Sequence, residues 1–401
     1  MKARQLFIVL VLLVAVGGAA LFLSRRNAGT WSSSAITNAR IVDFPLNDVA
    51  RVSIRSGGEE VSLVKKEELW RVQERADFPA DFEKVSALIR KVWELKPVQD
   101  VKVGPSQLER LQLTEPSAEA NSGTRLEFKA AGDNSLVALL LGKKLLRSSE
   151  PGLGRPSEFP VGRYVMPAGQ AQRVFLVADT FEDAPAKPEQ WLRRDFIKIE
   201  NPKLISVASP ELAINWTLVR ENASAAWKLT DAKPDEEIDP AKAASAASAF
   251  AYGNFNDVLP PDAEPAVTGL DTPASVRFET VDGFTYELRI GKVSADNYPV
   301  LVSVTANLPK ERPPAPDEKP EDKVRLDQEF QAKQKQLADK LTLEQQLPQR
   351  PYLIAKATVD QLVKGRVAFL IEKKPSPVPA APTASPGSAK PVPSPKGLPK
   401  P

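Results

Sequence analysis

The sequence predicts an α+β fold of two tandem repeats, each an antiparallel sheet with one main packed helix, behind an N-terminal transmembrane helix. Three observations predict it. The phrase LWRVQERADFPAD at 69–81 returns as AWKLTDAKPDEEID at 226–239. In both copies, strand-like alternation comes before the phrase and a helical pattern comes after it. An uncharged apolar run fills residues 6–23.

The start of the chain predicts a membrane anchor at residues 1–26. The run at 6–23 would reach about 27 Å as a helix, which is enough to span the hydrocarbon core of a bilayer. A cleaved signal peptide is the alternative, since Gly18-Ala19-Ala20 resembles a cleavage site. Cleavage there would leave Leu21 at the new terminus, which favours the uncleaved anchor. A short basic head before a large domain favours a single-pass protein of the bacterial inner (cytoplasmic) membrane, with its bulk extracytoplasmic or periplasmic.

The first predicted repeat covers residues 45–200 and follows a linker at 27–44. VARVSIRS and EEVSLVKK flank Gly57-Gly58, which is a hairpin signal, and LWRV supplies a third strand. Asp81 then stands where a helix N-cap is expected. The spacing of one helical face follows in Val85, Leu88, Ile89 and Val92.

The second predicted repeat covers residues 201–371 and presents the same parts in the same order. LISVAS, INWTLVRE and AWKLTD read as strands, and Asp239-Pro240 opens a helix with proline at its first position. Further on, LQLTEP matches TGLDTP, and Gly142-Lys143 matches Gly291-Lys292. This order predicts an internal duplication with about six or seven short strands in each copy. Chance similarity between strand-rich sequences is the alternative.

Two tryptophans occupy matching places in the predicted repeats. Trp70 and Trp227 each close a strand shortly before the helix. We expect them to pack the helix onto its sheet, because large aromatic side chains dominate such cores. A role in stacking against a ligand is the alternative.

Two segments depart from the repeat pattern. A charged insertion at 309–346 begins with a proline-rich stretch and continues with helical spacing, which predicts a protruding helix, either solvated or used as a docking arm. The segment 372–401 is rich in Pro, Ala, Ser and Lys and has no aromatics, so we expect a disordered tail. Its five lysines could contact an anionic cell-wall polymer or phospholipid, or they could serve solubility alone.

Composition excludes several kinds of chemistry. The chain has no Cys and no His, which removes disulfides, cysteine nucleophiles, His-based triads and His/Cys zinc sites. The net charge of +3 arises at the ends, because nine of the 54 basic residues lie within 1–26 and 373–401, where no acidic residue occurs. The acidic balance of the remainder predicts no nucleic-acid binding.

Motifs for nucleotides and metals are incomplete. Gly142-Lys143-Lys144 lacks the upstream glycine and the hydroxyl of a phosphate-binding loop, and GLGRPS at 152–157 lacks the third glycine of the dinucleotide pattern. Asp179, Glu182 and Asp183 could bind a hard cation, but their spacing matches no calcium loop. The sequence therefore predicts no catalytic residue, no cofactor-binding residue, no metal ligand and no enzymatic activity.

A family resemblance covers roughly residues 45–370. LWRVQERADFPADFEKVSALIRKVWELKPV, together with LQLTEP, TGLDTP and the LGK and IGK hairpins, resembles the bacterial family known as domain of unknown function 4340. The resemblance implies an auxiliary, membrane-tethered component that accompanies ABC-type transporters, including those linked with gliding systems. The insertion at 309–346 and the Pro/Lys-rich tail depart from the family pattern.

Together these observations predict a non-enzymatic, membrane-anchored, extracytoplasmic accessory or interaction protein with partners in an ABC-type transport or gliding-like complex. A cell-wall or polysaccharide binding protein is the alternative, which exposure of Trp31, Trp191 or Trp216 in a groove would favour. An enzyme of unrecognised type is the third hypothesis. A pocket that joins lysine, serine and carboxylate side chains between the repeats would favour it.

Overall fold

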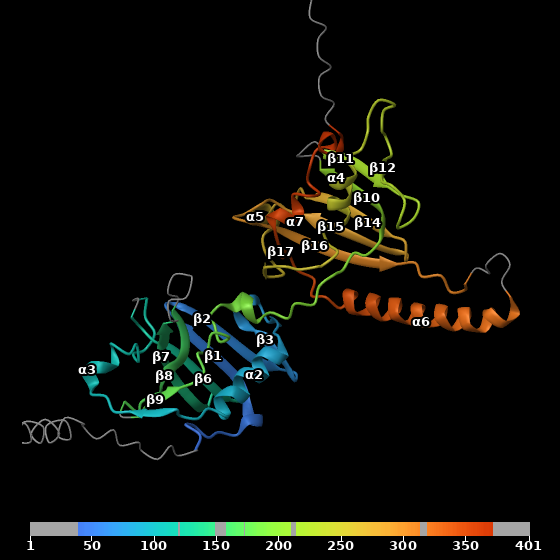
Figure 1. Cartoon of the computed structure of the whole chain (residues 1–401). Helices are drawn as coiled ribbons and strands as arrows, with labels where there is room; N and C mark the ends of the chain where they lie inside the picture. Colours follow the sequence, from blue (N-terminus) through green and yellow to red (C-terminus); the bar gives the residue numbers. More distant parts are fainter. Residues whose placement is uncertain are drawn as a thin grey trace, which may run out of the picture.

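The computed structural model confirms an α+β fold with two antiparallel sheets and few helices (Figure 1). We name residues 39–192 the N-terminal half and residues 202–371 the C-terminal half. The structure describes residues 39–371 except 119–120, 149–157, 172, 210–213 and 313–318.

Several predicted segments lie outside these described residues. They are the anchor at 1–26, most of the linker at 27–44, and the tail at 372–401. Among the described residues, no helix is both long and apolar enough to cross a membrane.

The N-terminal half contains a nine-stranded antiparallel sheet in the order β4-β3-β2-β1-β6-β7-β8-β9-β5. Its strands are β1 (Val49–Ser56), β2 (Glu59–Lys66), β3 (Leu69–Val72), β4 (Phe78–Pro79), β5 (Gln99–Val101), β6 (Thr124–Ala130), β7 (Ser135–Ser148), β8 (Glu158–Pro167) and β9 (Val174–Val177). Its helices are α2 (Phe82–Trp93), α3 (Pro105–Leu108) and the 3-10 turns η1 (Leu46–Asp48), η2 (Gln73–Arg75) and η3 (Pro188–Trp191).

The C-terminal half contains an eight-stranded sheet in the order β12-β11-β10-β14-β15-β16-β17-β13. Its strands are β10 (Pro202–Ser209), β11 (Ile214–Val219), β12 (Lys228–Leu229), β13 (Asp257–Val258), β14 (Ala274–Thr280), β15 (Phe284–Ile290), β16 (Asn297–Ala306) and β17 (Tyr352–Ala355). Its helices are α4 (Pro240–Ala247), α5 (Pro265–Thr268), α6 (Pro320–Gln345), α7 (Lys356–Val359) and the 3-10 turn η4 (Arg366–Phe369). Both sheets have more strands than the six or seven expected, because short edge strands of two to four residues complete them.

The main helices begin in the same way in both halves. The Asp81 carboxylate accepts a hydrogen bond from Lys84 N at the start of α2, and the Asp239 carboxylate accepts one from Ala241 N at the start of α4. These bonds satisfy backbone donors that have no partner inside the helix. The face of α2 predicted from spacing is buried, in Val85, Leu88, Ile89 and Val92.

The two sheets also share an irregularity. The pairing of β1 with β6 shifts by one residue between Val49 and Arg51, and the pairing of β10 with β14 shifts between Pro202 and Leu204. In each sheet the shift occurs at the start of the first strand, against the end of the same partner strand. A β-bulge bends its strand, so both sheets bend at one equivalent place.

Two glycines make a second shared feature. A Cβ atom on Gly142 would lie 2.3 Å from Leu111 O, and a Cβ atom on Gly291 would lie 2.2 Å from Thr268 O. The same carbonyl oxygens accept hydrogen bonds from the amides that follow, at 2.7 and 2.8 Å. Only glycine permits this close approach of two backbone segments. This explains why both halves carry a glycine at this place in the sequence.

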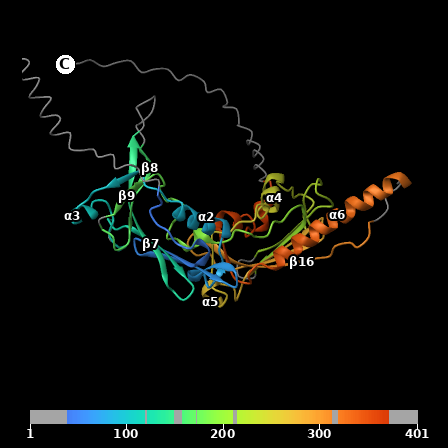
Figure 2. The ribbon, with the colours of Figure 1, turned by 90° about the horizontal axis from the view of Figure 1, so that it is seen from below.

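Helix α6 packs through its C-terminal part. Leu337 and Leu341 contact the apolar core, and Lys333 pairs with Asp282 in the β14–β15 turn at 2.6 Å. The N-terminal part of α6 extends beyond the sheet (Figure 2). The helix expected from the insertion at 309–346 therefore protrudes only with its first turns.

Candidate functional site: the joint between the two halves

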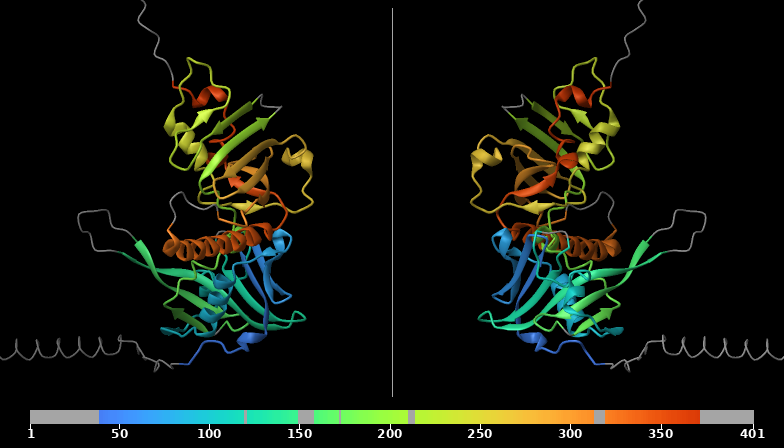
Figure 3. Two further views of the ribbon diagram at one scale, coloured as in Figure 1. Left: turned by 90° about the vertical axis from the view of Figure 1, so that its right-hand side faces the viewer. Right: turned by 90° about the vertical axis from the view of Figure 1, so that its left-hand side faces the viewer.

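The two halves meet where one corner of the N-terminal half contacts one edge of the C-terminal half (Figure 3). We name residues 73–80 the inner corner, and residues 255–258 with 350–353 the inner edge. The linker at 193–201 runs beside both. Residues of both halves belong to one continuous apolar cluster.

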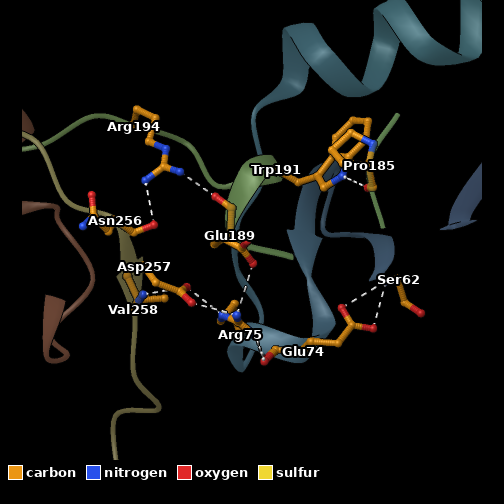
Figure 4. A network of polar contacts seen from close by, with 10 residues as sticks. All are labelled: Ser62, Glu74, Arg75, Pro185, Glu189, Trp191, Arg194, Asn256, Asp257 and Val258. Atoms are coloured by element: carbon orange, nitrogen blue, oxygen red, sulfur yellow. Dashed lines mark hydrogen bonds and ion pairs between the residues drawn. The ribbon is translucent and has the colours of Figure 1, made fainter. Parts of the chain in front are cut away.

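The inner corner contains two residues in an unusual backbone conformation. Ala76 and Asp77 adopt positive φ angles of 48° and 56°, a left-handed conformation that non-glycine residues seldom take. The Glu74 carboxylate accepts bonds from Ser62 N at 2.9 and 3.0 Å, which ties the corner to β2 (Figure 4). The corner thus presents Arg75 and Phe78 to the other half.

A bidentate ion pair connects the halves. Arg75 donates from Nε to one Asp257 oxygen at 2.6 Å and from Nη2 to the other at 2.7 Å (Figure 4). The two side chains are 23% and 21% exposed, so solvent screens them only in part. The hydrogen bond to Asp257 raises the pKa of Arg75 above its usual value. Such planar two-bond pairs fix orientation as well as distance.

Two further arginines donate to backbone carbonyls across the joint. Arg194 bonds to Glu189 O in the N-terminal half at 2.6 Å and to Asn256 O in the C-terminal half at 3.2 Å (Figure 4). Arg350 bonds to Arg75 O at 2.7 Å. Burial lowers the pKa of Arg194 and of Arg350 from the ordinary value for arginine. Each guanidinium therefore links segments that are far apart along the chain.

Aromatic rings fill the centre of the joint. Phe78 of the inner corner meets Phe255 and Tyr352 of the inner edge edge-to-face, with ring centroids 5.9 and 6.1 Å apart. Phe196 of the linker lies 4.8 Å from the Tyr352 ring. Edge-to-face contacts of this kind stabilise beyond the area they bury. An apolar centre surrounded by guanidinium groups holds the two sheets in one relative orientation.

A groove of about 600 Å³ lies beside the joint, between the linker and the last turns of α6. Its apolar residues are Phe196, Leu343 and Leu347, of which Leu343 is 68% exposed. Its charged residues have both signs and are Arg193, Arg194, Asp195, Lys198, Glu200, Asp339, Lys340 and Glu344. Exposed apolar surface inside a mixed-charge rim is typical of a protein-binding site.

A buried carboxylate holds α6 in place at the bottom of this groove. Glu344 accepts hydrogen bonds from Lys198 N at 3.0 Å and from the Tyr286 hydroxyl at 2.9 Å. Lys340 donates to Lys198 O at 2.7 Å and to Glu200 at 3.0 Å. Burial raises the pKa of Glu344, and burial beside Glu344 raises the pKa of Tyr286. The linker, the sheet and α6 thus meet at one polar cluster.

The three acidic residues that the sequence offers as cation ligands are paired with two lysines. Asp179 and Asp183 both pair with Lys91, at 3.0 and 2.6 Å, and Glu182 pairs with Lys144 at 2.7 Å. Within the described part of the chain, no group of acidic residues is arranged to hold a metal ion. The groove combines lysines and carboxylates, but no serine lines it.

The tryptophans are packed rather than presented to a ligand. Trp191 and Trp216 are buried and donate to Pro185 O and Lys364 O, both at 2.8 Å. Trp70 lies within β3 and packs in the core, whereas Trp227 precedes β12, is partly buried, and stacks with Arg220 at 4.6 Å. Neither tryptophan is the last residue of a strand, so the prediction that both close a strand is wrong. Trp31 lies outside the described residues.

The chain belongs to a family described as domain of unknown function (DUF4340). The family model matches residues 70–273, just over half of the 401 residues, which confirms the resemblance found in the sequence. The match includes the inner corner, the linker and β13, but neither α6 nor Arg350. No curated protein and no solved structure matches the chain.

Proposed function

We propose that this chain is a non-enzymatic, membrane-anchored, extracytoplasmic interaction protein that serves an ABC-type transport or gliding-like complex. The observation that carries the interaction role is the groove beside the joint, where an exposed leucine stands among charges of both signs. The transport or gliding setting rests on the family resemblance. A groove of this size accepts a few side chains of a partner protein. Its rim of lysines and carboxylates would set the partner's orientation.

The rigid joint supports the same function. An interaction protein loses less entropy on binding when its contact surfaces are already oriented. The bidentate pair of Arg75 with Asp257 and the rings around Phe78 provide this orientation. The inner corner and β13 lie within the segment that the family model matches, so the joint fits a role shared by the family.

The finer architecture is part of the proposal. Two tandem repeats that arose by duplication would explain the shared bulge after Val49 and Pro202 and the shared Gly-Lys pairs at 142–143 and 291–292. The apolar run at 6–23 would anchor the repeats to the bacterial inner membrane. The repeats would then stand outside the cytoplasm.

Cell-wall or polysaccharide binding is the less favoured alternative. Burial of Trp191 and Trp216 removes two of the three tryptophans that could stack on a sugar ring. The lysines of the 372–401 segment would be the residues that bind an anionic polymer under this alternative. An enzyme is the third alternative, and a groove without a serine gives it little support.

Affinity purification of the full chain from native membranes, after mild crosslinking, tests the proposal. We expect transport-complex subunits to be recovered with the wild type and lost with Leu343→Glu, which places a charge in the groove. Val324→Glu is the matched control, because Val324 is 64% exposed on the same helix but does not line the groove. It should retain the partners.

Two results would contradict the proposal. Recovery of glycan alone would favour the polysaccharide alternative. Equal recovery of protein partners with both variants would show that the groove is not the site of contact.

A further inference from the structure

The two halves contribute different kinds of surface to the joint. Each half also has a second surface, equivalent to the one that the other half contributes, and this second surface lies outside the joint. A corner of the N-terminal half contacts an edge of the C-terminal half. The C-terminal half has its own corner, at residues 231–238 with η4, which we name the outer corner. The N-terminal half has its own edge, at residues 97–101 and 173–177, which we name the outer edge. Neither takes part in the joint.

Hydrogen bonds define which positions of the two corners are equivalent. The N–H of Asp81 bonds to Trp191 O, and the N–H of Asp239 bonds to Phe369 O, both at 2.8 Å. Trp191 and Phe369 each end a four-residue 3-10 turn. Counting back two residues from Trp191 and from Phe369 shows that Glu189 at the joint corresponds to Val367 in the outer corner.

The two edges are aligned in the same way. Val98 N bonds to Leu176 O on β9, and Asn256 N bonds to Leu353 O on β17, both at 2.8 Å. These bonds precede β5 and β13, the outermost strands next to β9 and β17. Asn256 of the inner edge therefore corresponds to Val98 of the outer edge.

These equivalences bring two exposed valines together. In the joint, Glu189 and Asn256 lie side by side, because Arg194 donates to the carbonyl oxygens of both. Their counterparts, Val367 and Val98, are 77% and 49% exposed. If the outer corner met the outer edge as the inner surfaces do, the backbones at Val367 and Val98 would lie side by side. Burial of apolar side-chain surface at that place would favour the contact.

Charge and shape favour the same contact. The outer corner carries Asp231, Asp235, Glu236 and Glu237 against Lys233 and the paired Arg366, so it has an acidic excess. The outer edge itself carries Arg173 against Asp100, and Lys96 and Lys102 flank its first segment, so the edge together with these two lysines has a basic excess. A hollow of about 690 Å³ beside Val98, lined by the end of α2, gives room for an incoming turn. Opposite charges on two such surfaces steer their encounter.

We propose that the outer corner of one copy of this chain binds the outer edge of a second copy, which repeats the internal joint between molecules. The contact is head-to-tail, so each molecule keeps one unused corner or edge after binding. Such contacts extend into a ring or a row of copies rather than closing as a symmetric dimer. The partner on this surface is the chain itself, separate from any partner in the groove.

Cysteine crosslinking of the full chain tests this arrangement cleanly, because the natural sequence has no cysteine. We expect the double variant Val98→Cys, Val367→Cys to form a ladder of disulfide-linked species under mild oxidation. Each single variant alone should remain monomeric, and a mixture of the two single variants should give a heterodimer. Single variants that form dimers on their own would indicate a symmetric contact and overturn the proposal.

Two controls separate this contact from chance collision. The pair Val98→Cys, Val324→Cys has similar exposure but places the second thiol on α6, so it should give no ladder. Adding Arg173→Glu to the Val98→Cys, Val367→Cys variant should lower the crosslinked yield at least about fivefold, since it reverses a charge of the outer edge. A ladder of equal yield in either control, or none in the test pair, would contradict the proposal. Circular dichroism checks that each variant is folded.

Discussion

Removal of the ion pair between Arg75 and Asp257 gives a quantitative prediction for the joint. Two hydrogen bonds of 2.6 and 2.7 Å connect side chains that are 23% and 21% exposed. An exposed pair contributes about 0–1 kcal/mol, whereas breaking a buried pair costs about 3–5 kcal/mol. This pair lies between those limits. We therefore expect Arg75→Ala or Asp257→Ala to lower the free energy of unfolding by about 2 kcal/mol.

The double variant isolates the pair from other contacts of each side chain. Arg75 also approaches Glu189 at 3.5 Å, so the cost of one substitution exceeds the contribution of the pair itself. We expect a coupling energy of about 1–2 kcal/mol from the double-mutant cycle. Urea denaturation of the full chain at pH 7, followed by tryptophan fluorescence, measures it. The coupling should fall in 1 M salt (about a 3 Å screening length), because the charges are partly exposed.

A surface pair on α6 provides the control. Arg325 and Glu329 lie four residues apart at 2.7 Å, and both side chains are about 60% exposed. Their coupling should be below about 0.5 kcal/mol. If the Arg75–Asp257 coupling were no larger than this control, the reasoning that the pair fixes the joint would be refuted.

Two other predictions concern the backbone and pH. Gly142→Ala and Gly291→Ala should each destabilise the fold by at least about 2 kcal/mol in the same denaturation assay, because the added methyl group meets a carbonyl oxygen. Gly104→Ala, which has open space around it, should be nearly neutral, and an equal cost at all three sites would contradict the account. Burial raises the folded-state pKa of Glu344 above its usual 4.5, so ionisation costs stability and wild-type stability falls as pH rises from 4.5 through that pKa. Glu344→Gln should not show this fall, and parallel pH profiles of the two proteins would refute the assignment.

Local features of the fold could be predicted from the sequence. Alternation around Gly57-Gly58 located β1 and β2 with their observed bounds, and spacing after Asp81 located the buried face of α2. These elements are determined by neighbours along the chain. The matched phrases also indicated that the two sheets share their order of parts. The helix that Asp239-Pro240 opens is short, since α4 ends at Ala247 and turns follow.

The joint could not be predicted, because its contacts join distant residues. Arg75 and Asp257 are 182 positions apart, and Arg350 reaches a carbonyl 275 positions away. The spacing of apolar residues along the chain does not indicate which distant residues form such contacts. The positive φ angle of Ala76 could not be predicted either, because alanine seldom adopts the left-handed conformation. The sequence offers Trp191 as a residue that could contact a polysaccharide, yet its indole N–H donates a hydrogen bond to Pro185 O inside the fold.

The most direct test of the central claim, that the groove beside the joint binds a partner protein, is to repeat the membrane purification with a photo-crosslinking amino acid at position 343. We expect a covalent adduct with a subunit of a transport complex. The same probe at position 324 should give none. An adduct with glycan alone, or identical adducts from both positions, would contradict the claim.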